Sequence, residues 1–201
     1  MRVLVACEFS GIVRDAFTAR GHDAISCDLL ETERPGKHYQ GDVRDIINDG
    51  FDLMIAHPPC TYLCRQGQRW IGHPTHPNRL EKQIEAIEFF KSFFDNDIPR
   101  VCVENPVGVL NVQYRKPDQI IQPWQFGHDY SKKTCLWLKN LPQLRPTKVV
   151  ELTYVTLPSG KRFTRAWYEM PRKTRERSRT FQGIADAMAE QWDEIELEVT
   201  G

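Results

Sequence analysis

The sequence lacks a long hydrophobic run, a signal peptide and an excess of charge of either sign. A membrane-spanning helix needs about 20 consecutive apolar residues, so we expect no membrane partner. The 27 basic and 27 acidic residues cancel to a formal net charge of zero, so any binding of nucleic acid requires a local basic patch. The 201 residues are enough for one α/β domain with a full core.

The sequence also lacks a cysteine pattern typical of a disulfide framework or a zinc site. Its six cysteines are scattered, and Cys7, Cys27 and Cys102 lie in or beside apolar, strand-like runs where disulfides are not expected. Cys60 and Cys64, with the histidines downstream, match no zinc-ligand spacing. We therefore expect a reducing, cytoplasmic setting and no bound metal.

What the sequence does contain is a cysteine directly after two prolines. The apolar run from Phe51 to Ala56 predicts a buried strand, and Pro58 and Pro59 end it because neither can donate to a ladder. Cys60 then lies on a stiff loop at the carboxyl end of a strand, where ligands gather in open α/β sheets. This position favours a nucleophile over a buried structural thiol, which is the alternative.

The N-terminal stretch reads as a β-α-β unit with parallel strands. Arg2 to Ala6 predicts a strand, Ile12 to Arg20 a helix that Gly21 closes, and His22 to Cys27 a second strand. A glycine-containing loop follows the first strand and Asp28 follows the second. This arrangement suits a nucleoside-bearing cofactor, because a carboxylate there can accept hydrogen bonds from ribose hydroxyls.

Two further connections have a functional and a structural interpretation. Asp42 can meet an adenine amine or can cap a turn or helix. The long irregular stretch from Thr61 to Asn78 interleaves aromatic residues with Arg65 and Arg69. It predicts a lid that touches phosphate and stacks on a base, or else a solvated loop pinned by Trp70.

The clearest helix is predicted over Leu80 to Phe94, with one apolar stripe facing the core. The stripe and the residues that widen it are Leu80, Ile84, Ile87, Phe89, Phe90, Phe93 and Phe94. We interpret the phenylalanines as core rather than cofactor contacts. Arg100 to Val103 is the next strand, and Glu104-Asn105-Pro106 follows it. If this strand neighbours the one before Cys60, then Cys60 and Glu104 project into one cleft.

Together these segments resemble the cytosine-C5 DNA methyltransferases, which are class I, S-adenosylmethionine-dependent enzymes. The matching motifs are Phe9-Ser10-Gly11, Asp28, Gly41-Asp42-Val43, Pro58-Pro59-Cys60, Glu104-Asn105 and, near the end, Arg179 to Ile184 with the helix Ala185 to Trp192. Their order is right and they run over most of the chain. The stretches QPWQFGH (122–128) and SKKT (131–134) resemble short bacteriophage and prophage methylases of this kind.

The resemblance implies a Rossmann-like, doubly wound and mostly parallel sheet over residues 1–201, with a closing helix beside the cofactor. It implies Cys60 as the nucleophile that adds to cytosine C6 and Glu104 as the acid at N3. The implied contacts to S-adenosylmethionine are Phe9, Ser10, Gly11, Asp28, Asp42, Val43 and Pro58. Cationic neighbours should lower the pKa of Cys60, and His57, Arg65 and Arg69 are candidates because they are close in sequence. In a duplex, the base has to be flipped out.

The chain departs from the family where DNA would be recognised. Thr61 replaces the usual glutamine after the nucleophile, and Lys132-Lys133-Thr134 lies where the family has Gln-x-Arg-x-Arg. Only about thirty residues, 145–174, stand in place of a large recognition domain. They predict one small basic hairpin, with strands over 149–156 and 161–168, as an insertion in the fold. The expected phosphate contacts are Arg65, Arg69, Lys132, Lys133, Arg162, Arg165, Arg175 and Arg179.

The predicted function is methyl transfer to C5 of cytosine in DNA, in the cytoplasm of a bacterial or phage-infected cell. A hairpin so small would read little sequence, so specificity would be relaxed or supplied by a partner protein. One alternative keeps the chemistry but takes single-stranded DNA, RNA or a nucleotide as the acceptor. Another is a non-catalytic methylase-fold module that binds DNA or a protein.

Overall fold

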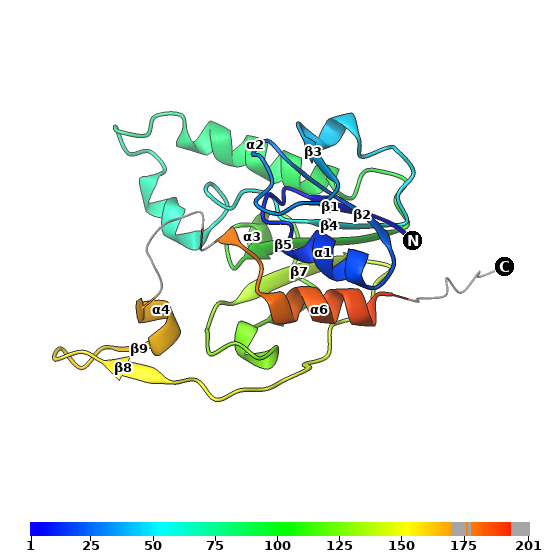
Figure 1. The fold of residues 1–201 in the computed structure, drawn as a ribbon. Helices are drawn as coiled ribbons and strands as arrows, with labels where there is room; N and C mark the ends of the chain where they lie inside the picture. Colours follow the sequence, from blue (N-terminus) through cyan, green and yellow to red (C-terminus); the bar gives the residue numbers. More distant parts are fainter. Residues whose placement is uncertain (170–175, 177, 194–201) are drawn as a thin grey trace.

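The core of the protein is a seven-stranded sheet with the strand order β3-β2-β1-β4-β5-β7-β6. The computed structural model describes residues 1–169, 176 and 178–193 (Figure 1). The strands are β1 (Arg2–Ala6), β2 (Asp23–Asp28), β3 (His38–Gln40), β4 (Leu53–Ala56), β5 (Arg100–Pro106), β6 (Gln119–Ile121) and β7 (Thr134–Lys139). Strands β1 to β5 pair in parallel, and β7 is antiparallel to both of its neighbours. This confirms the predicted fold class in its architecture, a doubly wound and mostly parallel α/β sheet.

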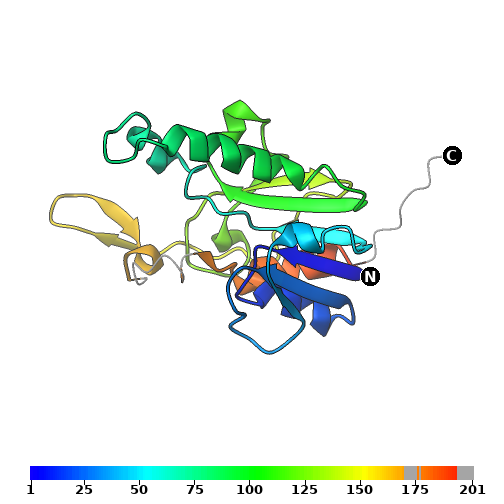
Figure 2. The same cartoon turned by 90° about the horizontal axis from the view of Figure 1, so that it is seen from above.

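Helices cover both faces of the sheet, as Figure 2 shows. Helices α1 (Ile12–Ala19) and α6 (Gln182–Gln191) lie on one face, whereas α2 (Arg79–Ser92) and α3 (Leu110–Gln113) lie on the other with the 3₁₀ turn η1 (Val43–Asp45). In β1, Val3 and Val5 face the first layer, while Leu4 and Ala6 face the second. Continuous apolar runs suit strands that are buried on both faces.

The apolar stripe predicted for α2 is only partly buried. Ile87, Phe90 and Phe93 are in the core, but Leu80 and Ile84 are 52% and 54% exposed, so their predicted burial is wrong. The reason is that the first turns of α2 lie against the loop 61–78 and not against the sheet. Arg79 and Gln83, at the start of the helix, donate to backbone carbonyls of that loop, which includes the 3₁₀ helix η2 (Arg65–Trp70).

The predicted hairpin insertion is present in shorter form. Strand β8 (Tyr154–Thr156) pairs antiparallel with β9 (Arg162–Thr164), and residues Arg165–Glu169 form helix α4 where the sequence predicted more strand. Arg165 and Glu169 form an i,i+4 ion pair at 3.3 Å, which favours the helical turn. We call residues 154–169 the arm. The remaining short element is the 3₁₀ helix η3 (Pro123–Gln125).

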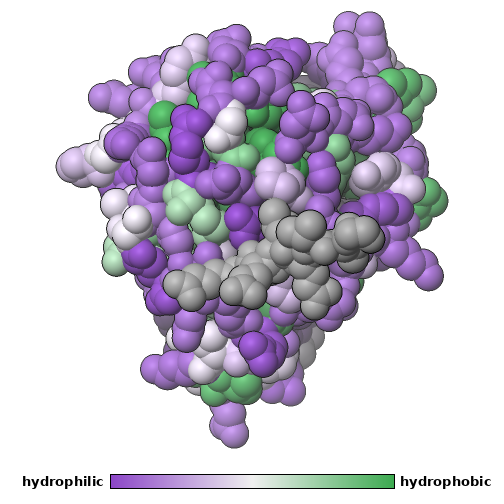
Figure 3. All heavy atoms as spheres, turned by 90° about the vertical axis from the view of Figure 1, so that its right-hand side faces the viewer, coloured by the Kyte–Doolittle hydropathy of each residue, from purple (hydrophilic) through white to green (hydrophobic). Residues whose placement is uncertain are grey.

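The two ends of the sheet differ in what surrounds them. The parallel strands finish at the end from which both the loop 61–78 and the arm project (Figures 1 and 2). Figure 3 looks onto the opposite end, where hydrophilic side chains predominate between small apolar patches. Among the described residues, no helix is long and apolar enough to cross a membrane.

Candidate active site

The loop after β1 is built around a left-handed glycine and a buried carboxylate. Gly11 has φ +70°, and a Cβ there would lie 2.5 Å from a guanidinium nitrogen of Arg14. Glu8 is buried and accepts hydrogen bonds from the backbone N–H groups of Val13 (2.7 Å) and Arg14 (3.2 Å), so it caps α1. It also accepts from the hydroxyl of Ser10, which is therefore turned inward. Sequence reasoning missed this role of Glu8.

A hollow lies where β1, β2 and β4 end. It is lined by Asp28, Leu29, Asp42, Val43, Pro59 and Phe89, and we call it the cofactor hollow. Three predicted cofactor residues thus meet in one place, whereas Pro58 is buried and its neighbour Pro59 faces the hollow. Phe89, which the sequence predicts as core, packs against the core but is only partly buried and also borders the hollow.

The two acids of the hollow have different partners. The Asp28 carboxylate accepts one hydrogen bond, from the backbone N–H of Leu30 at 2.9 Å. The Asp42 carboxylate caps η1 and binds the guanidinium of Arg44, with Nε at 2.9 Å. This hydrogen bonding lowers the pKa of Asp42 to about 2. Asp42 therefore carries the structural role that the sequence left open beside the functional one.

Strands β4 and β5 pair in parallel, so the loops that carry Cys60 and Glu104 leave the sheet side by side. The amide of Asn105 is buried and donates to the Pro58 carbonyl at 2.8 Å, which ties one loop to the other. His57 continues β4 by donating to the Ala6 carbonyl at 2.9 Å. Its Nδ1 lies 3.4 Å from Oε2 of Glu104. Strands β4 and β5 are therefore neighbours, which is the condition under which the sequence predicts that Cys60 and Glu104 share a cleft.

Glu104 is held in its ionised form. Burial raises the pKa of this carboxyl, but the hydrogen bond from His57 and the charge of Lys132 outweigh burial and hold the pKa below its usual range. A small cleft lies beside these groups and is also lined by Thr134, Phe181 and Met188. Burial, an ion partner and a cleft are together typical of functional sites.

The thiol of Cys60 is not activated in this structure. Desolvation, Cys64 and Glu104 raise its pKa, and only Lys132 among its charged neighbours lowers it. The expected activation by His57, Arg65 and Arg69 is therefore wrong. His57 faces Glu104, and the two arginines lie exposed on η2, with Arg69 over the ring of Trp70 at 5.0 Å. Lys132, which sequence reasoning placed on phosphate, is the cation whose charge acts on both Cys60 and Glu104.

The stretch from Gln122 to Tyr130 docks the closing helix α6. The backbone N–H of Gly183 donates to Nε2 of His128 at 2.9 Å, and the rings of His128 and Tyr130 pack on Phe181 at about 5 Å. A Cβ at Gly183 would lie 1.9 Å from the carbonyl oxygen of Phe126, so only glycine fits. Helix α6 packs against α1. The resemblance implied a closing helix beside the cofactor, and no residue of α6 lines the cofactor hollow.

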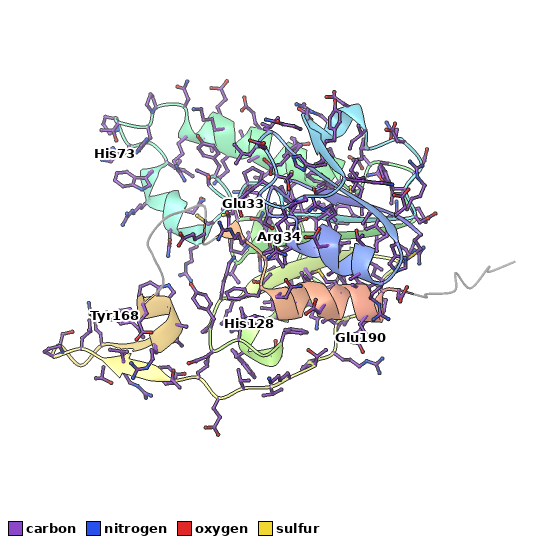
Figure 4. The ribbon with its side chains drawn as sticks, viewed as in Figure 1. Glu33, Arg34, His73, His128, Tyr168 and Glu190 are labelled. Atoms are coloured by element: carbon purple, nitrogen blue, oxygen red, sulfur yellow. The ribbon has the colours of Figure 1, made fainter. Side chains whose placement is uncertain are left out.

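Two arginines hold the loop between β2 and β3 in place beside the loop that follows β1. Arg14 is buried and donates to Ser26, Thr32 and the carbonyls of Arg34 and Pro35. Arg179 forms a bidentate ion pair with Glu33, at 2.8 and 2.9 Å. Figure 4 shows Glu33 beside the segment that leads into α6.

The expected phosphate contacts occupy several places. Lys133 is exposed next to β7, Arg162 and Arg165 lie on the arm, and Arg179 is paired with Glu33. Contact between Arg179 and phosphate would require that pair to open. Arg175 lies outside the described residues.

Comparison with known proteins adds one likeness of fold. No protein-family model and no curated protein sequence matches the chain. Among solved structures, the methyltransferase EhMeth of Entamoeba histolytica is similar over 75% of this chain, with 13% sequence identity and a TM-score of 0.49. The similar region spans 57% of that protein, little more than half its length. What this chain does must therefore be argued from its own site.

Proposed function

We propose that this protein transfers a methyl group from S-adenosylmethionine to C5 of cytosine in DNA. The observation that carries the proposal is the joined pair of loops at the ends of β4 and β5. They bring a solvent-accessible thiol, Cys60, and a half-buried carboxylate, Glu104, to one edge of the sheet beside a cofactor hollow. The topology and the adjacent hollow support the same reaction class.

The cofactor hollow has the chemistry that an adenosine requires. Leu29, Val43 and Phe89 offer apolar contact to a base, and the Asp28 carboxylate keeps acceptor capacity for ribose hydroxyls. Gly11 does not line the hollow, and the space that a Cβ there would need is taken by the Arg14 guanidinium. S-adenosylmethionine bound there supplies an electrophilic methyl group on its sulfonium.

The chain's own residues would carry the rest of the reaction. Cys60 adds as thiolate to cytosine C6, which moves the π electron pair of the C5–C6 bond to C5. Glu104, ionised in the free protein, takes up one proton as the base binds, and the carboxyl shares that proton with N3 to offset the developing charge. C5 takes the methyl group, then a base removes its proton, and the Cys60–C6 bond breaks to restore the aromatic ring. Lys132 favours the thiolate and neutralises Glu104, so it would act on both groups.

Calorimetric titration with S-adenosylmethionine tests the cofactor without knowledge of the acceptor. We expect saturable binding to the wild type and its loss in Asp28→Ala, because the carboxylate lines the cofactor hollow. Asp23→Ala is the matched control, because Asp23 is an exposed acid at the opposite end of β2 that pairs with Lys37. Absence of binding both with and without DNA would remove the methyltransferase proposal.

A DNA oligonucleotide carrying 5-fluorocytosine tests the nucleophile. The fluorine cannot leave as a proton does, so the enzyme should stay bound covalently through Cys60. Cys60→Ser should abolish the adduct. Cys64→Ser, four residues away and also accessible, should form it at the wild-type rate. Equal trapping of Cys60→Ser would refute the assignment.

One observation favours the non-catalytic alternative that the sequence left open. The pKa of Cys60 is raised in the free protein, so little thiolate is present there. A methylase-fold module that only binds DNA would show no adduct and no methyl transfer with any acceptor. The catalytic proposal requires instead that bound substrate favours the Cys60 thiolate, and the trapping experiment detects that thiolate by the adduct it forms.

A further inference from the structure

The arm carries aromatic rings that are partly exposed to solvent. Tyr154, Trp167 and Tyr168 are 44%, 36% and 49% exposed. The ring of Trp167 stacks on Phe163, with centroids 4.9 Å apart and planes inclined by 11°. Phe163 also lies within 6.5 Å of Tyr168, so three rings form one cluster over β9 and α4. Exposed aromatic clusters of this kind mark binding surfaces.

The charge on the arm is positive. Residues 154–169 contain Lys161, Arg162 and Arg165 against a single acid, Glu169. Arg162 lies over the ring of Tyr154 at 4.3 Å, and Arg165 is paired with Glu169. Lys161 is exposed at the turn. The arm therefore offers flat rings and a cation, and it contains no asparagine or glutamine that could read a base edge.

The arm is fixed at the end of the sheet where the site lies. The backbone N–H of Thr153 donates to the Asp129 carboxylate at 2.8 Å, and its hydroxyl donates to the other oxygen. Val150 donates to the carbonyl of Trp124 at 2.9 Å. Figure 4 places Tyr168 on the arm and His73 on the loop 61–78, which project from the same end of the sheet. The arm therefore lies at the same end of the sheet as the loop that follows Cys60.

We propose that the arm binds single-stranded DNA by stacking unpaired bases on its rings. In a duplex, the faces of the bases are covered by their neighbours, and recognition uses base edges. In a single strand, each base has an open face, and stacking on protein rings tolerates any sequence. Arginine can also read the edge of a guanine, but Arg162 lies over the ring of Tyr154 and Arg165 is paired with Glu169. Because the arm offers rings and a cation but no amide and no uncommitted arginine among its described contacts, it fits an unpaired strand better than a groove. This also names unpaired DNA as the acceptor, and that part rests on the proposed function.

Fluorescence anisotropy with a labelled single strand, the same sequence as a duplex, and the same sequence as RNA tests the binding. We expect the single strand to bind at least tenfold more tightly than the duplex. Trp167→Ala should weaken single-strand binding about tenfold, since one base–ring stack is lost. Lys161→Ala should weaken it less and reduce its salt dependence. Ile84→Ala, an exposed apolar residue on α2, is the control and should bind as wild type does.

Three outcomes would overturn the proposal. Equal or tighter binding of the duplex would mean that the arm does not require open base faces, and tighter binding of RNA would remove DNA as the occupant. Unchanged affinity in the double variant Trp167→Ala, Tyr168→Ala, with circular dichroism unchanged, would leave the arm as a protein-docking surface instead. All the substituted residues are exposed, so the variants should fold as the wild type does, and circular dichroism checks this.

The same reagents separate this inference from the proposed function. If the single strand binds through the arm but no 5-fluorocytosine adduct forms, the arm is a DNA-binding site and the proposed methyltransferase activity is refuted. If the adduct forms faster on the duplex and Trp167→Ala does not change its rate, the methyltransferase proposal is supported and the arm is refuted as its DNA-binding site.

Discussion

The hydrogen bond from Asn105 to the Pro58 carbonyl gives the sharpest prediction, because it can be tested before the substrate is known. Asn105 is 1% exposed, and its Nδ2 lies 2.8 Å from the Pro58 oxygen. Asn105→Leu keeps the side-chain volume and removes the donor. Leaving a buried carbonyl without its donor costs roughly 1–3 kcal/mol.

Part of that cost is offset by the asparagine itself. Its Oδ1 is buried with no partner among the described residues. Leucine therefore removes the cost of burying that oxygen at the same time as it removes the hydrogen bond to Pro58. We therefore expect a net loss of about 1–2 kcal/mol. For a chain of this size, each kcal/mol lowers the melting temperature by roughly 2–4 °C. The expected fall is thus a few degrees, measurable by calorimetry.

The effect on function should be larger than the effect on stability. The bond fixes the loop of Cys60 relative to Glu104, and a displacement of about 1 Å at a reacting group can cost about 100-fold in rate. The rate of adduct formation on 5-fluorocytosine DNA should fall accordingly. Asn111→Leu is the matched control, since Asn111 is an asparagine with an unpartnered Oδ1 that lies on α3. Wild-type melting and trapping in Asn105→Leu would refute the reasoning.

Three other changes have defined outcomes. Arg14→Met should destabilise the protein by roughly 3 kcal/mol in urea unfolding, because several buried acceptors lose one donor; a loss below 1 kcal/mol would contradict this. Burial lowers the pKa of His128, so the unfolded chain binds a proton at this histidine more strongly than the folded protein does. The free energy of unfolding should therefore be highest above about pH 6.5 and should fall as the pH drops below that value. In His128→Gln, which keeps an acceptor for Gly183, this dependence should flatten. Lys132→Gln should slow trapping about tenfold at neutral pH and shift its pH profile upward, because the pKa of Cys60 loses its lowering charge; Lys132→Arg should preserve the profile.

Sequence reasoning succeeded where the cause is local. The apolar runs before Pro58 and Glu104 could each be identified as strands, and the carboxyl ends of parallel strands share one edge of a sheet. The observed pairing of Ala56 with Val103 then sets the two reactive loops side by side. The left-handed Gly21 after α1 was likewise predictable from its position after a helical stripe.

Sequence reasoning failed where partners come from far along the chain. The direction of His57 depends on its backbone bond to Ala6, which extends β4 and turns the ring toward β5 and Glu104. Arg14 lies on a short helix with an apolar stripe, yet its acceptors are up to 21 residues away. Proximity in sequence therefore suggested the wrong cation for Cys60, and only the register of β7 brings Lys132 to the pair.

The contact between α1 and α6 has a consequence for how the chain matures. Helix α1 is made early, whereas α6, which covers its apolar side, is made late. During synthesis, Val13 and Phe17 have no partner from Ile184 or Met188 until the residues of α6 have left the ribosome. The first β-α-β unit therefore cannot bury the apolar side of α1 until α6 packs on it. Contacts so distant in sequence make folding slow. A nascent chain in this interval would expose apolar surface to chaperones.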